Sequence, residues 1–255
     1  MVDVESSQFS RVEKGEFMMT GMLASVRNLE EANIVCEGGA DIVDLKEPDY
    51  GVLGAVPLDM MHRVVDALWE KCLISATTGD LPANASAIED QVMKTSETGV
   101  DYVKVGMFSK QHIENCLPHL ASCACKGIAI IAVMFADLDF DMDYAIQTAK
   151  QAGLRGIMLD TARKGSGSLL KHKSILQLEY FVNRSRQNGL LIGLAGSLTV
   201  EDIPAVIKAG PNYIGFRSAL CSSQQRTSYI DKSAFQEVRS SIPILAGQNS
   251  ASRKI

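Results

Sequence analysis

The stretch GGADIVDLKEPDYGVLGA, residues 38–55, contains a short apolar run that ends in a turn. Its apolar run, residues 40–45, is typical of a buried strand; the run carries Asp44 and is followed by Lys46. A proline and a glycine then turn the chain away from the strand. Burying an ammonium group without a partner costs several kcal/mol or shifts its pKa. A lysine at the carboxyl end of a buried strand therefore indicates a functional role.

The rest of the chain repeats the pattern of an apolar strand followed by an amphipathic helix. Eight strands are predicted, at residues 22–27, 40–46, 73–78, 100–107, 128–135, 156–160, 190–195 and 212–217. Helices are predicted at residues 28–37, from 57 onward, and at 86–98, 110–123, 141–151, 174–187, 199–208 and 232–240. Three helices end in a glycine that returns the chain toward a strand, at Gly99, Gly153 and Gly210.

Continuous apolar strands separated by helices indicate a parallel sheet that is covered on its outside. Eight strand–helix units in 255 residues predict a (β/α)₈ TIM barrel in a single domain. A doubly wound open sheet is the alternative, and it fits less well because no G-x-G-x-x-G motif opens the first helix. We expect the barrel to span residues 21–245. Residues 1–20 are then either a loose arm or extra residues that result from a start site placed upstream of the real domain. Residues 246–255 are expected to be a polar tail.

Composition excludes several classes of protein. The net charge of −5 does not favour a nucleic-acid or anionic-membrane partner, and no apolar run is long enough to span a membrane. We therefore expect a cytoplasmic protein. The six cysteines contain no CxxC pair and are expected to be buried thiols, and the four histidines lack zinc-binding spacing, so no metal is predicted.

Charged side chains gather at the ends of alternate predicted strands. The second strand ends in Asp44 and Lys46, the fourth carries Lys104, and the sixth ends in Asp160, with Lys164 in the loop that follows. Alternate strands of an eight-stranded barrel contribute to the same interior layer, and active sites lie at the carboxyl ends of the strands. Taken singly, each lysine could be a solvated rim charge, and the Asp–Lys pair could be a structural ion pair. Their joint placement predicts one active site.

This set of residues suits carbonyl chemistry. A Schiff base requires a neutral amine, and both partial burial and neighbouring ammonium groups lower the pKa of a lysine. A second lysine or an aspartate can then move protons at the carbon next to the iminium. Clusters of lysines also bind phosphate.

The loops after the last two strands predict a phosphate site. The seventh strand runs into Gly196 and Ser197, and the eighth runs into Gly215, Arg217 and Ser218. These loops form the usual phosphate cradle of a (β/α)₈ barrel, where backbone N–H groups and a helix amino terminus meet the anion. Arg217 is expected to form a bidentate pair with the phosphate. The alternative is a pair of ordinary tight turns.

Two further polar segments, at residues 77–80 and 137–143, lie at or just after the ends of predicted strands. Residues 77–80, TTGD, end the third strand; they either shape the substrate pocket or place Asp80 to cap the next segment. The acidic run DLDFDMD, residues 137–143, lacks the glycine and glutamate of a calcium loop, so we interpret it as a capped loop.

With these residues in hand, the chain resembles the (5-formylfuran-3-yl)methyl phosphate synthase family, also called 4-(hydroxymethyl)-2-furaldehyde phosphate synthase, of methanofuran biosynthesis. The resemblance rests on six segments in order: GGADIVDLKEPDYGVLGA, SATTGD, DYVKVG, LDTARK, LAGS and GFRSALC. These segments cover the whole expected barrel, roughly residues 22–240.

The resemblance implies a (β/α)₈ lyase that condenses two molecules of glyceraldehyde 3-phosphate, with loss of phosphate and water, to a phosphorylated furan aldehyde. It implies that Lys46 is the Schiff-base lysine and Lys104 the proton acceptor, with Asp160 and Lys164 as further active-site groups. It implies no metal and no organic cofactor. The chain departs from the family in its additional amino-terminal residues and in the short GSGS loop after Lys164, which leaves the placement of that lysine open.

Two rival functions remain open from the sequence. A class I aldolase would use the same lysines and release a sugar phosphate. A non-catalytic barrel that binds a phosphorylated ligand is the rival of another class, and Lys46 beside Asp44 argues against it because anion binding does not require that pair. The expected partner is a small phosphorylated substrate. Barrels of this size often self-associate, so a homo-oligomer is also considered.

Overall fold

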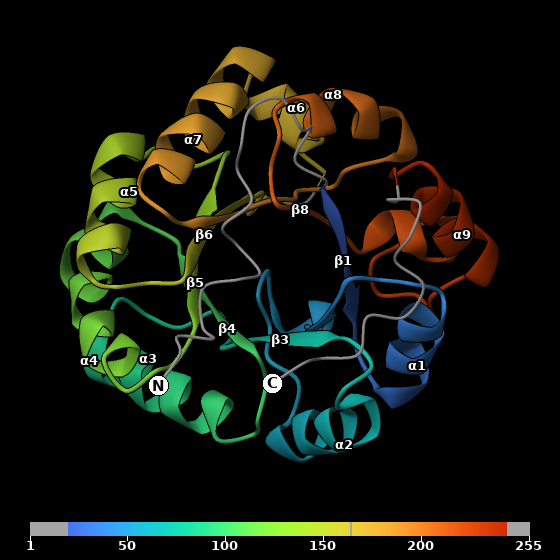
Figure 1. The fold of residues 1–255 in the computed structure, drawn as a ribbon, viewed down its shortest axis with the longest axis horizontal. Coiled ribbons are helices and arrows are strands. Elements are labelled where there is room, and N and C mark those ends of the chain that lie inside the picture. The colour runs from blue at the N-terminus through green and yellow to red at the C-terminus, as the bar shows by residue number, and fades with distance from the viewer. Residues whose placement is uncertain (1–19, 164, 244–255) are drawn as a thin grey trace, which may run out of the picture.

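Eight parallel strands close into a barrel in chain order, with the last strand paired to the first. The helices between the strands form a ring around the outside of this barrel (Figure 1). The computed structural model describes residues 20–163 and 165–243. The predicted TIM barrel is confirmed, and the doubly wound open sheet is wrong because the sheet closes on itself.

The strands lie where the apolar runs predict them, and no strand end differs from its predicted position by more than two residues. They are β1 (Gly21–Val26), β2 (Ile42–Leu45), β3 (Leu73–Thr77), β4 (Tyr102–Met107), β5 (Ile130–Phe135), β6 (Gly156–Asp160), β7 (Leu191–Leu194) and β8 (Tyr213–Phe216).

The outer helices follow the strands. They are α1 (Leu29–Glu37), α2 (Leu58–Leu68), α3 (Ala85–Ser96), α4 (Ala121–Ala124), α5 (Met142–Gln151), α6 (Leu169–His172), α7 (Ile175–Gln187), α8 (Ile203–Lys208) and α9 (Lys232–Ser240). Single 3₁₀ or π turns complete the loops: η1 (Pro48–Tyr50), η2 (His112–Cys116), η3 (Pro118–Leu120), η4 (Val200–Asp202), η5 (Ser218–Leu220) and η6 (Ser222–Gln224).

The barrel interior is filled by side chains from alternate positions of the strands. Leu23, Ile131, Val133, Phe135 and Met158 belong to one buried cluster inside the barrel. The opposite faces of the strands pack against the apolar faces of the helices in a second, larger cluster. A barrel of this size is therefore a packed core, and only its carboxyl end is open to form a site.

The three glycines predicted to end helices adopt the left-handed conformation. Their φ angles are +86° at Gly99, +69° at Gly153 and +76° at Gly210. This conformation is readily accessible only to glycine, and it turns the chain from each helix back toward the next strand.

The helix predicted over residues 110–123 is wrong as a continuous element. The segment forms the π turn η2, the 3₁₀ turn η3 and the short helix α4. Pro118 lies within this segment and has no backbone N–H to donate to the preceding turn, so a regular helix cannot run through it. The short helix α6, in the loop after β6, was not predicted because its four residues carry no periodic pattern.

Two helix caps follow from the sequence. Ser174 caps α7 in a capping box with Gln177. The Asp202 carboxylate accepts a hydrogen bond from the Thr199 N–H at 3.0 Å, as part of a capping box at η4, directly before α8.

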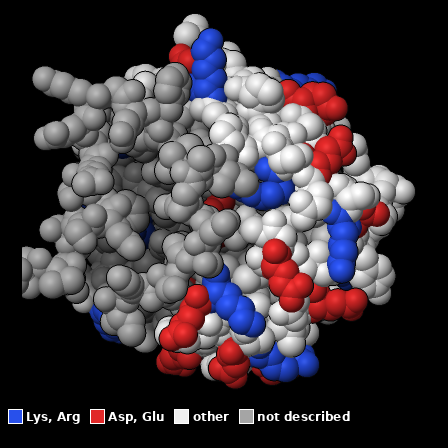
Figure 2. Space-filling view, turned by 45° about the vertical axis from the view of Figure 1, so that its right-hand side comes forward, with Lys and Arg blue, Asp and Glu red and all other residues white. Residues whose placement is uncertain are grey.

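The predicted arm and tail lie outside the described residues, apart from Thr20, whose hydroxyl donates to the carbonyl oxygen of Pro211 at 2.9 Å. Acidic and basic side chains are interspersed over the described surface seen in Figure 2. Within residues 20–163 and 165–243, none of the helices has the length and apolar character required to cross a membrane.

Candidate active site

A lysine and an aspartate form an ion pair inside the barrel. Lys104 Nζ, from β4, lies 2.9 Å from Asp44 Oδ2, from β2. The two side chains are 2% and 0% exposed. Because neither group can be solvated by bulk water, each depends on the other for its charge.

Two serines complete the surroundings of Asp44. Ser25 Oγ donates to Asp44 Oδ2 at 2.8 Å, and Ser75 Oγ donates to Oδ1 at 2.6 Å. The strand register explains this arrangement, since Ser25 on β1 and Ser75 on β3 are the direct neighbours of Asp44. Neither serine was predicted as a site residue. The available signal was that each is a polar residue in an otherwise apolar strand, and that these two strands flank the strand of Asp44.

The pKa values of this pair are shifted by their surroundings. Burial alone would raise the pKa of Asp44, but the charges of Lys104 and Lys46 and the hydrogen bond from Ser75 outweigh burial, so this pKa lies below its ordinary value. Burial lowers the pKa of Lys104; the charge of Asp44 opposes this shift and the charge of Lys46 adds to it. Lys104 therefore loses its proton more readily than an exposed lysine does.

Lys46 lies at the end of β2, nearer the cavity. Its Nζ is 3.5 Å from Asp160 Oδ2, at the end of β6, and the two residues are 8% and 7% exposed. The Thr161 N–H donates to Asp160 Oδ1 at 2.7 Å and fixes the orientation of the carboxylate. The structure thus brings together Asp44, Lys46, Lys104 and Asp160 from alternate strands, as predicted. Lys164 lies outside the described residues.

A cavity of about 370 Å³ opens above these residues. Its wall includes Lys46, Lys104 and Asp160, and its volume is in the range of small-ligand sites. Asp44 is not part of this wall. Asp44 belongs to the predicted active site, but it does not line the cavity and instead contacts Lys104.

The loop after β7 forms one side of the cavity. Gly196 has φ +118° and Ser197 has φ +47°, so two successive residues adopt left-handed conformations. A Cβ at Gly196 would lie 2.8 Å from Thr161 Cγ2 and 3.0 Å from Thr161 N. No described residue accepts a hydrogen bond from the backbone N–H of Gly196 or Ser197. Both donors remain available to a ligand in the cavity, which is the property of an anion-binding nest.

The loop after β8 forms the adjacent side. Gly215, within β8, and Ser218, after its end, line the cavity. A Cβ at Gly215 would lie 3.1 Å from Ala195 Cβ, so this position favours a residue without a side chain. Ser218 begins the turn η5, where the first N–H groups have no partner within the turn.

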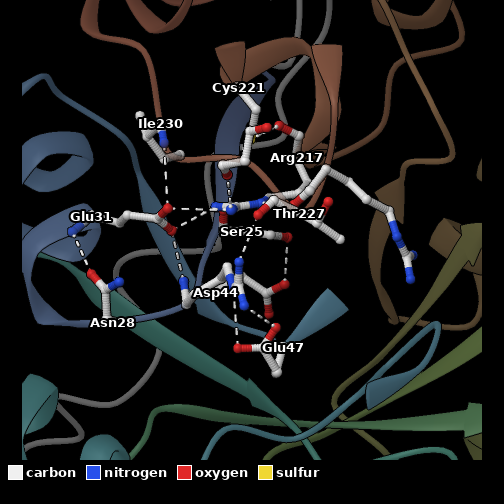
Figure 3. A network of polar contacts seen from close by, with 12 residues as sticks. Ser25, Asn28, Glu31, Asp44, Glu47, Arg217, Cys221, Thr227 and Ile230 are labelled. Carbon is white, nitrogen blue, oxygen red and sulfur yellow. Dashed lines mark hydrogen bonds and ion pairs between the residues drawn. The ribbon is translucent and has the colours of Figure 1, made fainter. Parts of the chain in front are cut away.

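Arg217 does not offer a free guanidinium to a phosphate, which corrects the prediction of a bidentate pair. Its Nη1 and Nη2 lie 2.6 and 3.2 Å from the carboxylate oxygens of Glu31, on α1 (Figure 3). Its remaining donors bond the carbonyl oxygens of Ser25, Arg226 and Ser228. Glu31 is 2% exposed. Arg217 therefore balances a buried carboxylate and ties the carboxyl end of β8 to α1.

Asp80 has a role that neither alternative anticipated. Its two carboxylate oxygens accept hydrogen bonds from the N–H groups of Val52 and Leu53, both at 2.7 Å. It is not part of the cavity wall. Asp80 instead holds the loop that follows Lys46.

Three or more His, Cys, Asp or Glu side chains do not come together as a metal site anywhere in the described residues. The cavity thus offers two lysines, one carboxylate on its wall and unpaired backbone N–H groups. This set can form an iminium, transfer protons and bind a phosphate.

Comparison with known proteins places these residues in a family. Residues 22–239 match the family described as 4-HFC-P synthase. A (5-formylfuran-3-yl)methyl phosphate synthase from Methanobrevibacter smithii is 33% identical over 230 residues, which cover 86% of this chain and 97% of that protein. A Methylorubrum extorquens protein with the same activity in its name is 34% identical over 211 residues, covering 82% of this chain and 86% of that protein.

Solved structures agree on the fold. A 3-hexulose-6-phosphate synthase superimposes with a TM-score of 0.64 at 18% identity, covering 88% of this chain and 100% of that one. Phosphoribosyl anthranilate isomerase from Thermotoga maritima gives a TM-score of 0.63, also at 18% identity, covering 88% and 98%. At this identity the likeness concerns the barrel and not the reaction.

Proposed function

The chain belongs to the 4-HFC-P synthase family, and from this premise we propose that it condenses two molecules of glyceraldehyde 3-phosphate into 4-(hydroxymethyl)-2-furaldehyde phosphate. The reaction releases phosphate and water, which makes the enzyme a lyase, and its product serves methanofuran biosynthesis. The observation that carries the proposal is the convergence of Lys46, Lys104 and Asp160 on one cavity.

Lys46 is the residue that forms the Schiff base. Its ammonium group lies on the cavity wall beside a carboxylate, Asp160, that can accept the proton the amine must lose before it attacks a carbonyl. Water that leaves on forming the iminium can take its proton from the same carboxyl group. The carbonyl carbon thereby becomes bonded to Lys46 Nζ.

Lys104 is the proton acceptor. An iminium withdraws electrons from the neighbouring carbon, so a base near it can remove a proton and leave an enamine. Burial lowers the pKa of Lys104, which favours the neutral amine that this step needs. Asp44 holds the Lys104 Nζ in place and does not touch the cavity. The enamine then adds to the aldehyde of the second triose phosphate.

The phosphate that remains in the product is bound by the loops after β7 and β8. The N–H groups of Gly196 and Ser197, together with the start of η5 at Ser218, offer donors to an anion in the cavity. This assignment replaces the predicted pairing with Arg217. Asp160 assists the later proton transfers of phosphate loss, dehydration and ring closure, and Lys164 is proposed to do so with it.

The proposed function is tested by identifying the reaction product. Purified protein is incubated with glyceraldehyde 3-phosphate, and ultraviolet absorbance of the furan aldehyde is followed together with released phosphate. We expect both to appear in a one-to-one ratio. A class I aldolase would consume the triose phosphate without furan absorbance or phosphate release, and a binding protein would leave the substrate unchanged; either result contradicts the proposal.

A further inference from the structure

Arg163, Arg217 and Arg226 line the cavity, and Arg226 was not anticipated from the sequence. Arg226 lies between η6 and α9, and it lines the same cavity as Lys46. Its Nη2 donates to the carbonyl oxygens of Pro48, at 2.6 Å, and Gly51, at 2.9 Å. Both carbonyls belong to the loop that follows Lys46, so Arg226 lies on the β2 side of the cavity.

The guanidinium of Arg226 retains unused donors. Its Nε is buried, and no described residue accepts a hydrogen bond from it. The hydrogen bonds that the Arg226 side chain donates to the described residues use Nη2 alone and go to backbone carbonyls. Leaving a buried donor unpaired destabilises a fold, so its retention at a cavity points to a ligand that accepts the bond.

The charge of Arg226 also lacks a directly bonded carboxylate among the described residues. Burial lowers its pKa, and Asp160 is the strongest of the carboxylates that oppose this shift. Arginine nevertheless remains protonated in proteins. Arg226 therefore brings a permanent positive charge to the cavity, in contrast to the two lysines, which must lose protons during the proposed reaction.

The backbone before Arg226 is strained. Ser223 and Gln224 are not glycines, yet both have φ +55°. A positive φ is unfavourable for residues other than glycine, and strained residues cluster at functional sites. Gln224 and Thr227, on either side of Arg226, also line the cavity. The loop is thus held in an unfavourable conformation that places Arg226 at the site.

We propose that Arg226 binds a second phosphate group, at a subsite separate from the backbone cradle of Gly196 and Ser197. The inference rests on the proposed function, in which two triose phosphates occupy the cavity together and so bring two phosphates into it. The cradle lies after β7 and β8. Arg226 comes from the same β8–α9 segment as Ser218, but its Nη2 is bonded to the loop after β2. β1 separates the two positions around the barrel. The ligand class is the phosphate monoester of a three-carbon compound.

The test uses glycerol 3-phosphate, which has no carbonyl and cannot form a Schiff base. Equilibrium dialysis with the radiolabelled compound counts the sites. We expect two per chain in the unchanged protein, one in Arg226→Gln, and two in Arg226→Lys with weaker affinity at one of them. The control is Arg63→Gln, which removes the same charge from the exposed surface of α2, where Arg63 is 58% exposed; it is expected to bind two.

The same variants are then assayed for furan formation. Loss of one charge-assisted phosphate contact in Arg226→Gln is expected to lower kcat/KM by about 100-fold, with partial recovery in Arg226→Lys. The inference is overturned if Arg226→Gln still binds two ligands, or if the unchanged protein binds only one. Two sites in a protein that makes no furan would instead contradict the proposed function and leave the Arg226 subsite standing.

Discussion

Replacing Asp44 by asparagine tests whether the buried ion pair holds Lys104 in its place. The Nζ–Oδ2 distance of 2.9 Å corresponds to an attraction of about 6 kcal/mol at an effective dielectric constant of about 20. Desolvation of both groups offsets part of this attraction, and breaking a buried pair by removing one partner costs about 3–5 kcal/mol. Asp44→Asn leaves Lys104 with no carboxylate in contact, so we expect a loss of about 4 kcal/mol in the free energy of unfolding.

The pair is best measured by a double-mutant cycle. Lys104→Met alone leaves the Asp44 carboxylate buried without its cation, and we expect a similar loss of about 3–5 kcal/mol. The double variant removes both charges, so its loss should be at least about 2 kcal/mol smaller than the sum of the single losses. Urea unfolding gives the free energies; for a chain of this size a 4 kcal/mol loss also lowers Tm by about 8–16 °C.

A matched control cycle uses the exposed pair between Asp59 and Arg63 on α2, 3.6 Å apart. Its coupling should be below about 0.5 kcal/mol because solvent screens both charges. Additive losses at Asp44 and Lys104, within about 0.5 kcal/mol, would show that the two groups do not stabilise each other.

Three further predictions follow from the site. Lys104 must be neutral to accept a proton, and its pKa is lowered. We therefore expect kcat to rise with pH, and the midpoint of this rise to lie below pH 10.5, the ordinary pKa of lysine. A kcat that falls as the pH rises toward 10.5 would contradict the role of Lys104 as a base. Gly196→Ala should lower the free energy of unfolding by about 1–3 kcal/mol and raise KM, because φ is +118° and the added Cβ would press on Thr161; unchanged unfolding and KM would argue against the cradle. Arg217→Met should cost about 3–5 kcal/mol in urea unfolding because Glu31 would stay buried without its cation, and a loss below about 1 kcal/mol would return Arg217 to consideration as a phosphate ligand.

The sequence was sufficient to place the candidate site residues because strand periodicity governs their positions. Lys46, Lys104 and Asp160 lie on strands whose apolar runs are clear, and the closure of eight parallel strands brings alternate strand ends together. The position of Asp44 within β2 was also predictable. Its place beneath the cavity was not, because depth inside the barrel depends on strand tilt and on the two serines that bond it.

The arginines were harder to assign because their side chains are long and reach distant partners. Arg217 follows the last residue of β8, where strand alternation no longer fixes direction, and its partner Glu31 is 186 positions away in the chain. Arg226 lies in a loop without periodicity, and its contacts are backbone carbonyls of another loop. Nothing in the sequence pattern indicates that Glu31 pairs with Arg217, or that these backbone carbonyls bind Arg226.

In the proposed reaction, Lys46 forms a covalent bond with the substrate. The protein is incubated with glyceraldehyde 3-phosphate, the iminium is reduced with borohydride, and the modified peptide is identified by mass spectrometry. We expect one adduct per chain, on Lys46, and none in Lys46→Met. The absence of an adduct, or an adduct confined to Lys104 or Lys164, would contradict the account.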